Sequence, residues 1–410
     1  MALGALDIGS PDTRKRPRED TQRAAIEDAW SKTTLACPLK CPESIAKKIQ
    51  FGEGSYITLC RSVPVEKERS VLVVCQESGI TDFLDPTTFT VVGKSVRHAS
   101  STLSMDCDTP LEATESAWIG LGYRDGWVKV YDADSHKLVR KFEKVHELGV
   151  STVVFVGNKR ADALQGHSPF LLSGSFDTTM CLLDISSGAS LFQVKDAHHS
   201  SFINSICVLP FRIGVYTLSS GNDGSLAFWS LGKADSPAVE RCGNVIPLQR
   251  VSPDCGDGVA SSLSLLPSTS SAPSRCELVV ATNVDKVLLC GVEMGLGESG
   301  EAAFDVVPFA ILQCGKPILS VSYGVPNANF VSFYVCDCEG LLYLYNMELD
   351  SERQKDAKVS VMSPVDVSSL LVIEHGDNVK EARADVVYPH SGNPMLSIYS
   401  ASFPELYLVQ

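Results

Sequence analysis

One short pattern recurs along this 410-residue chain, and its spacing restricts the fold more than any other feature. Its clearest copy is "SSGNDGSLAFWS", in which Ser219 lies four residues before Asp223 and Trp229 lies six residues after it. Related copies are centred on residues 78, 125, 177, 285, 339 and about 403, so the interval between copies is 46 to about 64 residues. A self-similar period of this size indicates a fold assembled from repeated units.

Each repeat contains up to four short runs rich in Val, Leu, Ile and aromatic residues, separated by turns of Gly, Asp, Asn or Ser. The runs "FINSICVLP", "GVYTLSSG" and "SLAFWSL" are typical of antiparallel β-strands in both length and composition. Four such strands form one blade of a propeller, and blades in a ring bury one another's faces. The sequence therefore predicts an all-β, seven-bladed propeller over residues 44–410.

The two ends of the propeller sequence predict how the ring closes. The chain stops at "ELYLVQ", which is typical of a third strand with no fourth strand after it, whereas "SIAKKIQF" precedes the first complete repeat. Closure of a ring removes unpaired strand edges that would otherwise promote aggregation. We therefore expect the N-terminal strand to pair with the C-terminal strand and to complete the seventh blade.

The polar residues of the repeat, together with a histidine before each first strand, resemble the WD40-repeat family over roughly residues 44–410. The resemblance implies a hydrogen-bonded structural tetrad in the fourth repeat, formed by His199, Ser219, Asp223 and Trp229. A buried aspartate needs such partners because its desolvation is otherwise costly. Partial copies of the tetrad are expected at His146, Ser173 and Asp177 in the third repeat and at His98 and Asp125 in the second.

Ser, His and Asp could also form a hydrolase triad, which requires one exposed nucleophile beside an oxyanion hole. Here the pattern recurs with Leu183 or Tyr131 in the tryptophan position, and decayed copies of this kind are typical of a structural motif. The sequence contains no glycine-rich phosphate loop between a strand and a helix and no paired Cys/His knuckles. We therefore expect a non-enzymatic protein without a cofactor or a bound metal.

Residues next to each turn aspartate are candidates for partner binding, because those just before it are expected to point outward on one face of the ring. Aromatic and arginine side chains are favoured anchors at interfaces, so Tyr123, Arg124 and Phe176 are the first candidates. The formal net charge of −14 excludes broad, phosphate-driven binding of nucleic acid and favours basic peptides as partners. The full set of predicted contacts is Tyr123, Arg124, Phe176, Asn222, Val284 and Cys338.

Residues 1–43 are predicted to form a flexible N-terminal arm with a short helix at "DTQRAAIEDAWSK". The basic cluster Arg14, Lys15, Arg16 and Arg18 is typical of a nuclear import signal. No secretory signal and no membrane-spanning run is evident in the sequence. We expect a nuclear protein, with the cytoplasm left open as a second compartment.

These features favour a scaffold that mediates protein–protein interactions within a multi-subunit complex. The basic arm supports an alternative, in which the chain is a non-catalytic subunit of an RNA-processing, ribosome-assembly or RNA-modifying complex. In that case it would contact nucleic acid only indirectly or through a local patch. A propeller enzyme is a third possibility, for which the sequence shows no convergent set of acid, base or metal-binding residues.

Overall fold

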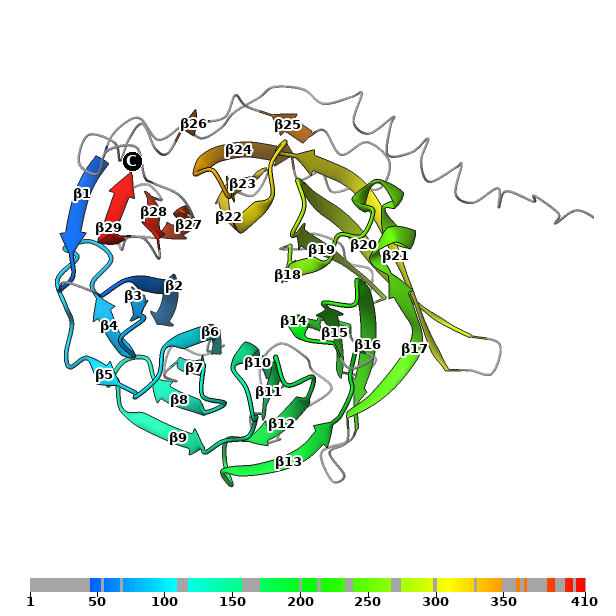
Figure 1. The fold of residues 1–410 in the computed structure, drawn as a ribbon, viewed down its shortest axis with the longest axis horizontal. Helices are drawn as coiled ribbons and strands as arrows, with labels where there is room; N and C mark the ends of the chain where they lie inside the picture. Colours follow the sequence, from blue (N-terminus) through cyan, green and yellow to red (C-terminus); the bar gives the residue numbers. More distant parts are fainter. Residues whose placement is uncertain are drawn as a thin grey trace, which may run out of the picture.

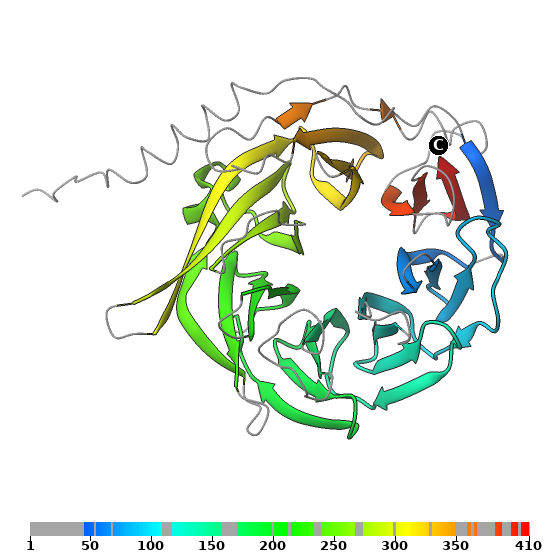
Figure 2. The same cartoon turned by 180° about the vertical axis from the view of Figure 1, so that it is seen from behind.

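The structure is a computed structural model, and seven small antiparallel sheets surround a central opening in it (Figures 1 and 2). The predicted N-terminal arm, with Arg14, Lys15, Arg16 and Arg18, lies outside the described residues. The structure describes residues 45–52, 55–66, 69–108, 117–156, 170–198, 201–211, 215–232, 239–266, 274–297, 301–327, 330–348, 359–361, 365–366, 382–387, 395–400 and 403–409.

Each sheet is one blade, and its first strand faces the central opening (Figure 1). Blade 1 comprises β2 (Ile57–Glu66), β3 (Arg69–Gln76), β4 (Ile80–Leu84) and β5 (Val96–Arg97). Blade 2 comprises β6 (Thr102–Asp108), β7 (Trp118–Tyr123), β8 (Val128–Asp132) and β9 (Leu138–Phe142). Blade 3 comprises β10 (Val150–Val156), β11 (Phe170–Ser175), β12 (Met180–Asp184) and β13 (Ala189–Val194). Blade 4 comprises β14 (Ile203–Leu209), β15 (Val215–Gly221), β16 (Ser225–Leu231) and β17 (Val239–Pro247).

The remaining blades follow the same order, except that the last one draws on both ends of the propeller sequence. Blade 5 comprises β18 (Ala260–Leu265), β19 (Arg275–Thr282), β20 (Lys286–Leu296) and β21 (Ala302–Gln313). Blade 6 comprises β22 (Ile318–Asn327), β23 (Phe330–Asp337), β24 (Leu341–Glu348), β25 (Val359–Val361) and β26 (Val365–Asp366). Blade 7 comprises β27 (Ala382–Val387), β28 (Met395–Ser400), β29 (Phe403–Val409) and β1 (Ile45–Gln50).

The ring closes as predicted, because the first strand of the chain is the outermost strand of blade 7. Strand β1 pairs antiparallel with β29, with Lys48 opposite Tyr407 and Gln50 opposite Glu405. The backbone N–H of Phe51 extends this pairing by donating to the carbonyl of Pro404 over 3.0 Å. The seven-bladed, all-β fold and its closure by the terminal strands are therefore confirmed.

The apolar core lies between neighbouring blades. Between blades 3 and 4, for example, Phe170 and Leu182 pack in one cluster with Ile206 and Trp229, and all four side chains are buried. Strands β11 and β15 are buried almost throughout, which explains why their sequences are near-continuous apolar runs with small residues. The structure describes only two short helical segments, α2 (Leu248–Val251) and the 3₁₀ turn η2 (Pro253–Cys255), and neither could cross a membrane.

Hydroxyl-bearing side chains on the innermost strands connect several neighbouring blades. Ser104 donates to the carbonyl of Val150 over 2.8 Å, and Ser205 accepts from the backbone N–H of Leu263 over 3.1 Å. Ser322 accepts from the backbone N–H of Val386 over 3.0 Å in the same manner. Because buried backbone groups are costly when unpaired, these bonds fix the position of each blade relative to its neighbour.

The innermost strand pair contains a β-bulge at the same position in six of the seven blades. A bulge adds one unpaired residue and increases the local twist of the strand. In blade 7 the pair β27–β28 runs without a shift in register. The shifts occur at Ile57/Leu59, Thr102/Ser104, Val150/Thr152, Ile203/Ser205, Ala260/Ser262 and Ile318/Ser320.

Candidate protein-interaction face

A hydrogen-bonded network in blade 4 connects the loop before β14 with strands β15 and β16. Trp229 donates its indole N–H to Ser219 Oγ over 2.7 Å, and His198 Nε2 lies 2.7 Å from the same oxygen. His198 Nδ1 lies 3.3 Å from Asp223 Oδ1 and 3.0 Å from Ser225 Oγ. Because an indole can only donate, Ser219 can direct its own proton to Nε2 of His198, which places the Nδ1 proton toward Ser225 Oγ and Asp223.

The histidine of this network is His198, whereas the spacing in the sequence selected His199. His198 is 1% exposed, and its ring packs so closely over the backbone of Gly221 that a Cβ there would lie 2.4 Å from the ring. His199 itself lies outside the described residues. The loop from His198 to β14 at Ile203 is one residue longer than the loop from His146 to β10 at Val150, so the spacing that fits blade 3 selects the next residue in blade 4.

The network lowers the pKa of the Asp223 carboxyl. Partial burial raises this pKa, but hydrogen bonds from His198 and Ser225 outweigh burial and bring it to about 2. The carboxylate therefore stays ionised across the physiological range and acts as a fixed acceptor. Ser219, in contrast, is completely buried, so its hydroxyl is not presented to a substrate in solution.

Blade 3 contains the same network without the tryptophan. His146 lies 2.8 Å from both Ser173 Oγ and Thr179 Oγ1, and Asp177 accepts from Thr179 Oγ1 over 2.6 Å. Burial raises the pKa of Asp177, but its bonds with His146 and Thr179 hold it well below the usual range. Leu183 occupies the position of Trp229 and packs in the core instead.

One member of each network was not anticipated from the sequence. Thr179 in blade 3 and Ser225 in blade 4 both lie two residues after the turn aspartate and bridge it to the histidine. The recurrence of a hydroxyl residue at this offset, in "DTT" and "DGS", is the signal that could have identified them.

Blade 2 holds its histidine differently. His98 Nε2 lies 2.9 Å from Asp125 Oδ2, so the two side chains contact each other without an intervening hydroxyl. Leu121 stands in the serine position and is buried. The ring of His98 lies 4.0 Å from that of Tyr123, which occupies the site taken by Ser175 in blade 3 and Gly221 in blade 4.

Tyr123 is therefore not a surface contact, contrary to the prediction. It is the last residue of β7 and is only 1% exposed, because its ring fills the space beneath His98. The next residue, Arg124, is exposed at the turn. Successive residues of a strand point to opposite sides, so Tyr123 lies on the core side and Arg124 on the solvent side.

The partner contact predicted in blade 5, Val284, lies one residue after the position that corresponds to Asn222 in blade 4. In blade 4 the backbone N–H of Asn222 donates to Phe202 O over 2.8 Å, and in blade 5 the corresponding bond runs from Asn283 to Val259 over 3.0 Å. Asn283, not Val284, is thus the equivalent of Asn222, and it is exposed while Val284 is half-buried. The equivalent backbone donors in blades 1, 2, 3 and 6 are Glu77, Arg124, Phe176 and Cys338.

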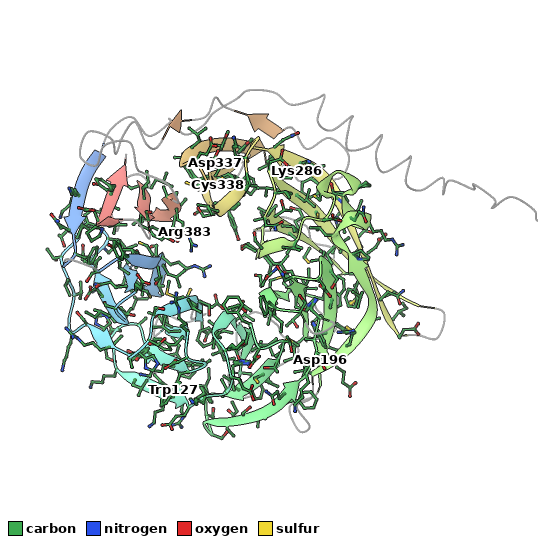
Figure 3. The ribbon with its side chains drawn as sticks, viewed as in Figure 1. Trp127, Asp196, Lys286, Asp337, Cys338 and Arg383 are labelled. Carbon is green, nitrogen blue, oxygen red and sulfur yellow. The ribbon has the colours of Figure 1, made fainter. Side chains whose placement is uncertain are left out.

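An exposed apolar patch lies on this face over blades 2 to 4. Phe176 and Phe202 contact each other edge to face, with ring centroids 5.6 Å apart, although Phe202 remains 45% exposed. Leu148 is 51% exposed and precedes Gly149, whose backbone lies between Arg124 and Phe176. We call Arg124, Leu148, Phe176 and Phe202 the aromatic patch. Of the other predicted contacts, Asn222 is exposed and Cys338 is half-buried; Figure 3 places Cys338 in blade 6, away from this patch.

These features define a seven-bladed β-propeller whose blades are small antiparallel sheets. The sequence matches no known family, and no curated protein matches it. Among solved structures, the propeller is similar to the crystal structure of the computationally designed Ika8 protein, with 13% sequence identity and a TM-score of 0.47. That similarity covers 86% of this chain and 83% of the designed chain.

Proposed function

We propose that this protein is a non-enzymatic, WD40-type scaffold that binds protein partners through the aromatic patch. The contact between half-buried Phe176 and exposed Phe202 is the observation that carries the proposal. Large apolar side chains at the surface of a folded domain indicate an interaction site when they are contiguous, and aromatic and arginine residues supply most interface hot spots. The networks of blades 3 and 4 anchor the turns after Phe176 and Asn222 through Asp177 and Asp223.

The charges around the patch favour a partner with basic residues next to an apolar anchor. Glu147 is exposed beside Leu148, and its backbone N–H donates to Asp177 Oδ2 over 2.8 Å. The chain carries a formal net charge of −14, which would steer a basic segment toward this face. Arg124 contributes the one positive charge within the patch and would pair with a carboxylate or a terminal group of the partner.

Membership of a nuclear multi-subunit complex is part of the same proposal, and its support is the basic cluster at Arg14, Lys15, Arg16 and Arg18. That cluster also supports the alternative, a non-catalytic subunit of an RNA-processing, ribosome-assembly or RNA-modifying complex. Nuclease treatment separates the two, because partners held through RNA are released by it and partners held by direct contact are not.

Quantitative affinity purification from cells tests the patch. We expect Phe202→Ser and Arg124→Glu to reduce recovery of the same partners at least tenfold relative to the parent chain. Leu296→Ser is the matched control, because Leu296 is 81% exposed on β20 and lies outside the patch. Equal recovery in all four proteins, with melting temperatures unchanged, would refute the proposed binding face.

A further inference from the structure

The central channel is a second feature, independent of the aromatic patch. It encloses about 740 Å³ and is lined by the innermost strands of all seven blades. This volume is within the range of small-molecule binding sites. Serine hydroxyls make up much of the wall, and Ser261 and Ser262 on β18 are both exposed to the channel.

Four charged side chains line this channel near the junction of blades 7, 1 and 2. Arg61 on β2 donates to the carbonyl of Met105 over 3.1 Å and lies 3.8 Å from Asp106 Oδ1. Arg383 on β27 is exposed at the inner edge of the ring (Figure 3). Asp385 follows two residues later on the same strand.

The two carboxylates are engaged by the wall, whereas both arginine side chains are exposed. Asp106 is 11% exposed and accepts from the backbone N–H of Phe155 over 2.9 Å. Asp385 accepts from Ser322 Oγ over 2.7 Å and from the N–H of Val386 over 2.9 Å. Burial raises the pKa of Asp385, and the charge of Arg61 and the Ser322 hydroxyl oppose that rise.

The positive groups, in contrast, retain unused donors. The side chain of Arg61 is 49% exposed, and its contacts with Met105 and Asp106 both involve one guanidinium nitrogen, Nη1. Among the residues that the structure describes, none forms an ion pair with Arg383. An anion entering the channel would therefore meet more exposed positive charge than negative charge, and guanidinium groups bind oxyanions through two donors at once.

We propose that the channel binds a small oxyanion carrying at least two negative charges, held by Arg61 and Arg383 and by serine hydroxyls of the wall. Two sources share this chemistry, a phosphate compound and a polycarboxylate. Pyrophosphate and citrate serve as probes that distinguish them, and the channel volume admits either one.

Isothermal titration of the full-length protein with each probe tests the site. We expect Arg383→Gln to weaken binding of the preferred probe at least tenfold. Arg250→Gln is the matched control, because it removes the same charge from α2 outside the channel and should leave the dissociation constant within twofold. Ser262→Asp provides a second test, since it adds a carboxylate to the opposite wall and should weaken binding to the same degree.

Three results would overturn the proposal. Neither probe binding at millimolar concentration is the first, and an equal loss in Arg383→Gln and Arg250→Gln is the second, because it would indicate general electrostatic attraction. Unchanged affinity in folded Ser262→Asp is the third. Recovery of protein partners through the aromatic patch should be the same in Arg383→Gln as in the parent chain, so the two sites are tested separately.

Discussion

Trp229 donates to Ser219 over 2.7 Å, and both side chains are almost fully buried. This bond joins the third strand of blade 4 to the second, and His198 extends it to the loop that leads into the blade. Blades 2 and 3 retain fewer members of the network, with Leu183 in place of the tryptophan in blade 3. Of these three blades, blade 4 therefore has the network with the most members.

Replacing the indole tests this bond directly. Trp229→Phe removes the donor and should lower the free energy of unfolding by about 1–3 kcal/mol, since a hydrogen bond and some packing are lost. Urea denaturation measures the change. Trp127→Phe is the matched control, because that half-buried indole makes ring contacts and no hydrogen bond to another described residue, and its replacement should cost less. Equal costs for the two variants would contradict the assigned role.

Removal of the turn carboxylate should also destabilise blade 4. Asp223→Ala leaves His198 and Ser225 without their shared acceptor, so we expect a loss of about 1–3 kcal/mol in unfolding free energy. The neighbouring Asn222→Ala changes an exposed side chain on the same turn and should stay within about 0.5 kcal/mol of the parent. An unchanged melting temperature in Asp223→Ala would show that the network does not stabilise the fold.

The low pKa of Asp223 predicts an acid-dependent contribution to stability. Its folded pKa of about 2 lies below the ordinary value of 3.8, so the contribution is present above pH 4 and is lost as the pH falls through 2. The Asp223→Asn variant has no ionisable group at this position and lacks this pH-dependent contribution to stability. The stability gap between the parent and Asp223→Asn, followed by urea denaturation, should therefore shrink as the pH falls from 5 to 2. A gap that stays constant would contradict the pKa assignment.

Closure of the ring predicts different results for two truncations. A chain that begins at residue 53 lacks β1 and exposes the edge of β29, so we expect oligomers or aggregates. A chain that begins at residue 43 keeps β1 and should remain monomeric with the melting temperature of the parent. Light scattering and thermal unfolding distinguish them. Monomeric behaviour of both proteins would show that β1 is dispensable.

Much of the architecture could be predicted from the sequence because it follows from local patterns. The recurring turn, the period between copies and the apolar runs predicted four-stranded blades, and the unmatched runs "SIAKKIQF" and "ELYLVQ" predicted the closure. Strand alternation and turn chemistry act over a few residues, so a single sequence contains this information.

Tertiary structure alone decided which residue at each site faces inward. His198 rather than His199 joins the network, Tyr123 is buried under His98, and Asn283 rather than Val284 takes the outer position. Each choice depends on where a loop or a strand end meets its neighbour, and a shift of one residue reverses the side on which a side chain lies. The charged lining of the channel also depends on tertiary structure. Arg61, Asp106 and Arg383 come from three different blades and line one channel only when the ring has closed.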